Sequence, residues 1–112
     1  MNIEHVRERL LARREELRAR EVRANAGLRE QPDLSTADEG DVSNQSERNG
    51  LLTALSRAAD TELKQVEGAL QRIQDGSYEA CAVCGEPIEP QRLEAVPYTS
   101  RCIHCAAIGS NA

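Results

Sequence analysis

The chain has 112 residues, a formal net charge of -5 and a pI near 5.1. It contains no Phe or Trp, so aliphatic side chains must form a core that is thin in a chain this short. The charge is uneven, because residues 1 to 29 carry eight Arg against five Glu and the remainder carries six basic against fourteen acidic groups. The acidic C-terminal part lacks the basic surface of a duplex-binding domain, which argues against direct, sequence-specific DNA binding.

The sequence lacks the signals of several other protein classes. No apolar run approaches the roughly 20 residues that span a bilayer, and no N-terminal leader pattern is found. There is no phosphate-binding P-loop, dinucleotide-binding glycine motif or nucleophile elbow. We therefore expect a cytoplasmic protein without a membrane segment and without catalytic activity of its own.

The N-terminal part predicts one long helix from Asn2 to about Arg29. Apolar residues recur there every seven positions, which is the spacing of a helix with a single apolar stripe. The stripe consists of Ile3, Leu10, Leu17 and Ala24, with Val6 between the first two. A helix this long with one apolar stripe requires a partner.

A second helix is predicted from about Asn44 to Asp75, and Gly76 supplies a left-handed stop. Its stripe alternates spacings of three and four residues, as in a coiled coil. The stripe is Leu52, Leu55, Ala59, Leu63, Val66, Leu70 and Ile73. We expect residues 1–76 to form a long antiparallel two-helix coiled-coil hairpin in a monomeric, mainly α protein.

The segment between the two helices is predicted to form the tip of the hairpin, over residues 32–43. Pro32 ends the first helix, and Ser, Thr, Asp and Gly residues follow. The segment contains no base and four acids, Asp33, Asp38, Glu39 and Asp41. In the simplest interpretation it is a solvated loop, and Asp41 or Ser43 caps the second helix.

All four cysteines lie in two C-x-x-C pairs, Cys81/Cys84 and Cys102/Cys105. Two such pairs at this separation can complete a tetrahedral sulfur shell for one Zn²⁺, and four thiolates leave no open position for catalysis. Gly85 suits the tight turn of a metal knuckle. We therefore expect residues 77–112 to form a small C4 zinc-finger module with one structural Zn²⁺.

Other interpretations of the cysteines stay open. One is a thiol-disulfide oxidoreductase, and another is an iron-sulfur centre. His104 lies within the second pair but is expected on the surface, because four thiols already complete the shell. Thr99 or Ser100 is expected to cap a short helix that carries Cys102 and Cys105.

Beyond the cysteines, Ile88, Arg92 to Ala95, Pro97 and Ile103 share a register that resembles the zinc finger of the DksA/TraR family, the DnaK suppressor proteins. The resemblance implies a short family member that binds RNA polymerase through its secondary channel. The hairpin tip then lies near the catalytic Mg²⁺ and modulates transcription initiation. The alternative from another class is a structural or redox-sensing zinc protein.

The family's tip motif, D-x-x-D-x-A, aligns with Asp38, Asp41 and Ser43, so these are the implied effector residues, with Ser in place of Ala. Members that bind guanosine tetraphosphate carry basic residues at two positions that here are Val96 and Ala106. For this reason guanosine tetraphosphate is not carried over as an expected ligand. Target promoters and the direction of regulation do not follow from the sequence.

Overall fold

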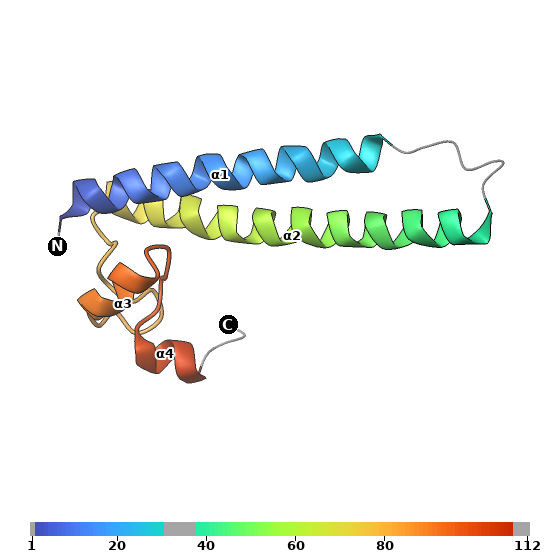
Figure 1. The fold of residues 1–112 in the computed structure, drawn as a ribbon. Coiled ribbons are helices and arrows are strands. Elements are labelled where there is room, and N and C mark those ends of the chain that lie inside the picture. The colour runs from blue at the N-terminus through green and yellow to red at the C-terminus, as the bar shows by residue number, and fades with distance from the viewer. Residues whose placement is uncertain (1, 31–37, 109–112) are drawn as a thin grey trace. The chain divides into compact units, whose positions relative to one another are not determined.

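The computed structural model describes residues 2–30 and 38–108. Four helices follow one another along the chain (Figure 1): α1 (Ile3–Arg29), α2 (Glu39–Asp75), α3 (Pro90–Ala95) and α4 (Ile103–Ile108). These residues contain no β-strand, and one isolated antiparallel bridge joins Ala80 to Pro87. The predicted mainly α fold, two long helices followed by a small cysteine-bearing module, is confirmed.

By its internal contacts the chain divides into two compact units, Glu15–Leu63 and Met1–Arg14 with Lys64–Ala112. The predicted division at residue 76 follows the elements, whereas the observed units group the first turns of α1 and the end of α2 with the zinc-finger module. The boundary at residue 76 therefore stays a prediction about chain organisation. Within the described residues, no helix combines the length and apolar character needed to cross a bilayer.

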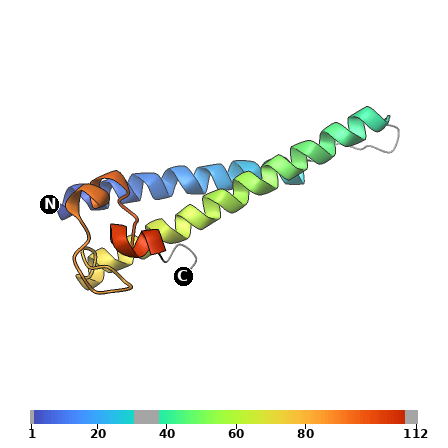
Figure 2. The same cartoon turned by 90° about the horizontal axis from the view of Figure 1, so that it is seen from below.

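The unit Glu15–Leu63 contains parts of α1 and α2 that lie side by side and antiparallel (Figures 1 and 2). The Ser56 hydroxyl donates to the Asn25 side-chain oxygen at 3.1 Å. A Cβ added to Gly27 would lie 3.0 Å from Leu52 Cδ1, so the helices approach closely where this glycine occurs. The small side chain at position 27 therefore permits the packing of Leu52.

The other unit contains the start of α1, the end of α2 and the module with the cysteines. The core between its helices consists of aliphatic side chains, because the chain contains no Phe or Trp. Buried residues of the two long helices in this unit are Val6, Leu10, Val66, Ala69 and Ile73. In the module Tyr78, Ile88 and Leu93 are each at most 2% exposed.

The end of α2 is set by Gly76, as predicted. Its φ is 81°, in the left-handed region that favours glycine. The Ser77 N–H donates to the Arg72 carbonyl at 2.9 Å, and the Gly76 N–H donates to the Ile73 carbonyl at 3.3 Å. These two bonds form a Schellman motif, which satisfies the last carbonyls of the helix and turns the chain into the module.

The predicted start of the second helix was wrong by about one turn. α2 begins at Glu39, so residues 39 to 43 are helical. The cap is Asp38 and not Asp41 or Ser43, because the Asp41 N–H donates to the Asp38 side chain at 2.9 Å. Acidic residues in the first turn, Glu39 and Asp41, also interact favourably with the helix dipole. The rest of the predicted tip, residues 32–37, lies outside the described residues.

The predicted apolar stripes were largely correct for α1 and partly wrong for α2. Val6, Leu10, Leu17 and Ala24 are all buried. Leu55 is 53% exposed, whereas Ala69, which the prediction omitted, is fully buried. Leu70 is only half-buried. Positions 69 and 70 both lie three and four residues from Val66 and Ile73, so local spacing does not distinguish them, and the packing of the helix buries the smaller residue.

Candidate functional site

The first pair of cysteines lies in a tight knuckle that follows α2. The Gly85 N–H donates to the Cys81 carbonyl at 3.0 Å, and the Cys81 N–H donates to the Glu86 carbonyl at 2.8 Å. Gly85 has a φ of 80°, so the predicted need for a glycine at this turn is met. The knuckle is joined to the second pair by the Ala82 N–H, which donates to the Ser100 carbonyl at 2.7 Å.

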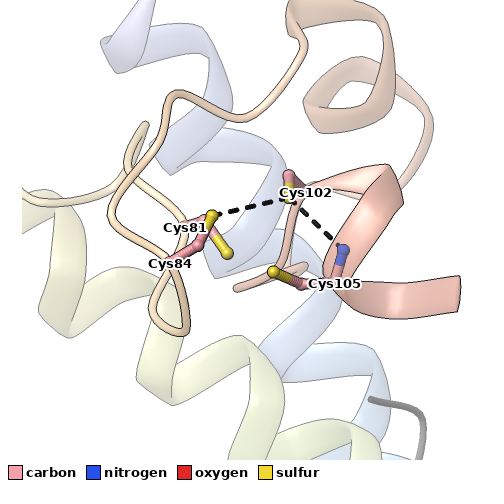
Figure 3. Close-up of side chains that lie close together, drawn as sticks. All are labelled: Cys81, Cys84, Cys102 and Cys105. Atoms are coloured by element: carbon pink, nitrogen blue, oxygen red, sulfur yellow. Dashed lines mark hydrogen bonds between the residues drawn. The ribbon is translucent and has the colours of Figure 1, made fainter. Parts of the chain in front are cut away.

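The second pair lies at the start of α4. The Cys105 N–H donates to the Cys102 sulfur at 3.4 Å, so the thiol itself occupies the capping position of this helix (Figure 3). The prediction that Thr99 or Ser100 caps this helix was therefore wrong. Thr99 instead stabilises the preceding turn, since its hydroxyl accepts from the Arg101 N–H at 3.4 Å.

The fold brings all four predicted cysteines together. Their sulfur atoms lie within 4.8 Å of one another, from the knuckle and from the start of α4 (Figure 3). The Cys84 and Cys102 sulfurs are 3.8 Å apart. Zn–S bonds of about 2.3 Å in a tetrahedron give sulfur pairs separated by about 3.8 Å. The donor set and its spacing thus fit one structural Zn²⁺.

The polar surroundings of the thiols differ. Backbone N–H groups of Cys84 and then Cys102 lower the pKa of Cys81 to about 6. Burial, followed by the neighbouring thiols of Cys84 and Cys102, raises the pKa of Cys105 to about 12. Four thiolates at one point repel one another, so a divalent cation is needed to hold all of them deprotonated. When bound, Zn²⁺ supplies that charge and closes the shell.

Three side chains position the loop before the second pair, and two of them, Tyr78 and Arg72, were not identified from the sequence. The Tyr78 hydroxyl donates to the Pro97 carbonyl at 2.7 Å, and Arg92 Nε donates to the Arg101 carbonyl at 2.8 Å. Arg72, near the end of α2, donates through Nη2 to the Thr99 carbonyl at 3.1 Å. Burial raises the pKa of Tyr78, so the buried phenol stays a neutral donor.

A signal for one of these contacts was present in the sequence. Tyr78 is one of two aromatic residues in the chain and lies two residues after the Gly76 stop, so a role in the core of the module could have been inferred. Arg72 carries no comparable signal, because charged residues on a helix usually face solvent. Exposed His104 lies outside the sulfur cluster, as expected.

The three residues predicted as effectors lie at the start of α2. Asp38, Asp41 and Ser43 are exposed, and Glu39 between them is exposed as well. Asp38 precedes the helix and accepts the Asp41 N–H through Oδ1. The structure thus places these polar groups on one exposed helix start, and their effector role stays a prediction.

The two positions that argued against guanosine tetraphosphate, Val96 and Ala106, both line a cavity of about 470 Å³ in the cysteine-bearing unit. The basic residues of this cavity come from other positions, namely Lys64, Arg72, Arg92 and Arg101. Two of these guanidiniums donate to backbone carbonyls, as described above. Cationic lining is therefore present, but part of it is engaged in holding the module together.

Comparison with known proteins agrees with this geometry. Residues 76–108 match the family model of the prokaryotic dksA/traR C4-type zinc finger. A protein of Caulobacter vibrioides, the RNA polymerase-binding transcription factor DksA, is 35% identical over 96 residues, which cover 85% of this chain and 66% of the relative. An uncharacterised protein of Aquifex aeolicus is 36% identical over 66 residues, 59% of this chain and 46% of the relative.

A solved structure extends the similarity to both long helices. The structure of transcription factor DksA2 from Pseudomonas aeruginosa matches with a TM-score of 0.80 and 30% identity, covering 96% of this chain and 81% of that chain. The chain spans less than two thirds of the length of the two curated relatives. The hairpin, the four clustered cysteines and these similarities together show that the chain belongs to the DksA/TraR family.

Proposed function

We propose that this protein binds RNA polymerase and regulates transcription initiation, with its two-helix hairpin in the secondary channel of the enzyme. The observation that carries the proposal is the match of 96% of the chain to the DksA2 structure, which includes the hairpin as well as the finger. The Caulobacter relative is itself named as a polymerase-binding transcription factor. The structural Zn²⁺ is assigned no catalytic role.

The start of α2 supplies the chemistry for an effect near the polymerase active site. Its carboxylates, Asp38, Glu39 and Asp41, are exposed on a helix that begins at residue 39. Carboxylates brought near a divalent cation and its phosphate ligands change the local electrostatics and compete for polar contacts. The implied effectors are Asp38 and Asp41, and Ser43 adds a hydroxyl where the family motif has Ala.

Asp38 combines a structural and a proposed functional role, which makes the choice of substitution important. Its side chain caps α2 through the Asp41 N–H, and Asn caps helices about as well as Asp. Asp38→Asn therefore removes the charge while it keeps the cap. Asp38→Ala removes both, so it does not separate an electrostatic effect from a disordered helix start.

The test is transcription in vitro with purified bacterial RNA polymerase, read as open-complex lifetime at several promoters. The wild type is expected to change this lifetime, and Asp38→Asn with Asp41→Asn is expected to lose most of the effect. Polymerase binding, measured by competition with another secondary-channel factor, should persist in the double variant. A matched control is Glu8→Gln with Glu47→Gln, which removes two exposed carboxylates elsewhere on the long helices.

Two results would contradict the proposal. One is a wild-type protein that neither binds polymerase nor competes with a secondary-channel factor. The other is a tip double variant that changes open-complex lifetime as much as the wild type does. The alternative, a structural or redox-sensing zinc protein, predicts no effect of either pair and a change only on oxidation of the thiols.

A further inference from the structure

The unit Glu15–Leu63 contains a groove between α1 and α2 that none of the proposed effector residues lines. Its volume is about 400 Å³. The floor is apolar and buried, formed by Leu17, Ala24 and Ala59. Leu52 and Leu55 line it from α2, and Leu55 is 53% exposed. A large aliphatic side chain is thus left accessible beside a buried apolar floor.

The groove has the dimensions of a helix-binding site. On α2 the lining runs from Leu52 to Glu62, which at about 1.5 Å per residue is about 15 Å, or three helical turns. On α1 the lining includes Leu17, Arg20 and Ala24, at spacings of three and four residues. Such ridges on two antiparallel helices accept the side chains of a third helix that packs along them.

The charge around the groove indicates which helix would fit. Arg20 and Arg23 line it from α1 and are exposed. Within the described part of the chain, neither guanidinium has a hydrogen-bond or ion-pair partner. The one acidic lining residue, Glu62, does have a partner. The charged groups at this groove that are open to a partner are therefore the two guanidiniums, and carboxylates would complement them.

We propose that this groove docks an amphipathic helix from another protein, with an aliphatic stripe about three turns long and carboxylates beside the stripe that pair with Arg20 and Arg23. The stripe covers Leu52 and Leu55 and extends the two-helix packing to three helices. A second copy of this chain fits less well, because a two-fold contact places the same cationic patch on both sides of the interface. The test below uses no polymerase, so its outcome is separate from that of the proposed function.

The probe is a capped amphipathic peptide of about five helical turns, with Leu at i, i+3, i+7 and i+10 and Glu on both flanks of this stripe. The matched control peptide carries Lys in place of every Glu. Binding to the full-length, zinc-loaded protein is followed by amide chemical shifts and calorimetry. We expect saturable shifts along the groove, and at least about fivefold weaker binding of the Lys peptide, since each exposed ion pair contributes up to about a fewfold.

Protein variants then locate the site. Leu55→Asp should weaken binding of the Glu peptide at least about tenfold, because it removes the burial of one Leu. Leu51→Asp is the matched control: Leu51 is 61% exposed on the same helix but does not line the groove, so binding should change less than about twofold. The double variant Arg20→Glu with Arg23→Glu should prefer the Lys peptide. This gain of binding also shows that the variant is folded.

Several outcomes would overturn the proposal. They are the absence of saturable shifts, equal affinity for the two peptides, and equal effects of Leu51→Asp and Leu55→Asp. Sedimentation of the protein alone provides a further check. A dimer that dissociates on Leu55→Asp would show that a second copy occupies the groove, and the proposed partner would then be wrong.

Discussion

The Tyr78 hydroxyl connects the two halves of the zinc module, and removing it by Tyr78→Phe should weaken zinc binding. Tyr78 is 2% exposed, and its hydroxyl donates to the Pro97 carbonyl at 2.7 Å, nineteen residues further along the chain. The substitution keeps the ring, so no cavity forms. Only the hydrogen bond that holds the loop before Cys102 is lost.

The size of the effect follows from the geometry of this bond. A neutral hydrogen bond contributes about 1 kcal/mol net, and a buried carbonyl left without its partner costs about 1–3 kcal/mol. Pro97 is partly exposed, so water can partly replace the lost donor and the lower part of this range applies. We expect a loss of about 1.5 kcal/mol. Because zinc binding and folding of such modules are linked, this loss corresponds to about tenfold weaker zinc binding.

The assay is competition for zinc with a chromophoric chelator, at constant pH and under reducing conditions. Tyr98→Phe is the matched control, because Tyr98 is the other aromatic residue and its hydroxyl makes no hydrogen bond among the described residues. It should change zinc affinity less than about twofold. If Tyr78→Phe binds zinc as tightly as the wild type, or if both variants lose affinity equally, then this hydrogen bond does not support the metal-bound loop.

Three further predictions test the pH dependence, the cap and the helix stop. Burial raises the pKa of Tyr78, so the stability that its neutral form contributes is complete below the usual value of about 10 and is lost as pH rises above it. Tyr78→Phe should remove that alkaline step from unfolding curves followed by circular dichroism. Asp38→Ala should destabilise the start of α2 by about 1 kcal/mol, seen as faster hydrogen exchange of the Asp41 amide, whereas Asp38→Asn should leave exchange nearly unchanged. Gly76→Ala should lower the free energy of unfolding in urea by about 1 kcal/mol, because residue 76 has a positive φ. Gly50→Ala should raise it by up to about 1 kcal/mol, because Gly50 lies within α2 and a Cβ there meets open space. A change of the same sign in both variants would contradict these two predictions.

The sequence predicted the helices well because their apolar spacing is regular and long. Val6, Leu10, Leu17 and Ala24 are buried as expected. The error in α2 arose from preferring large residues. Leu70 was chosen over Ala69, although both lie at spacings of three and four residues between Val66 and Ile73, and Ala69 is the fully buried one. Spacing narrows the choice to adjacent positions, and the packing against the partner helix decides which of them is buried.

The metal ligands were predictable and most of their supports were not. The spacing of Cys81, Cys84, Cys102 and Cys105 is enough to predict that they form one cluster, because a metal site requires few residue types at fixed separations. The contact of Arg72 with Thr99 joins residues 27 positions apart, and no local pattern specifies it. The cap of α2 was misassigned for a related reason, since Asp38, Asp41 and Ser43 are all suitable capping residues and only the structure distinguishes them.

The contacts of Arg72 give the zinc module a role in the packing of the long helices. This residue lies in the last turn of α2, its carbonyl accepts the Ser77 N–H of the helix stop, and its guanidinium donates to the Thr99 carbonyl. On the other long helix, Arg9 donates to the Glu94 carbonyl of α3 at 3.2 Å. Both long helices are thus bonded to the segment between the two cysteine pairs, which leads into Cys102. Because metal binding and folding are linked in such modules, we expect zinc to stabilise the N-terminal turns of α1 and the C-terminal turns of α2 against each other as well as the finger itself.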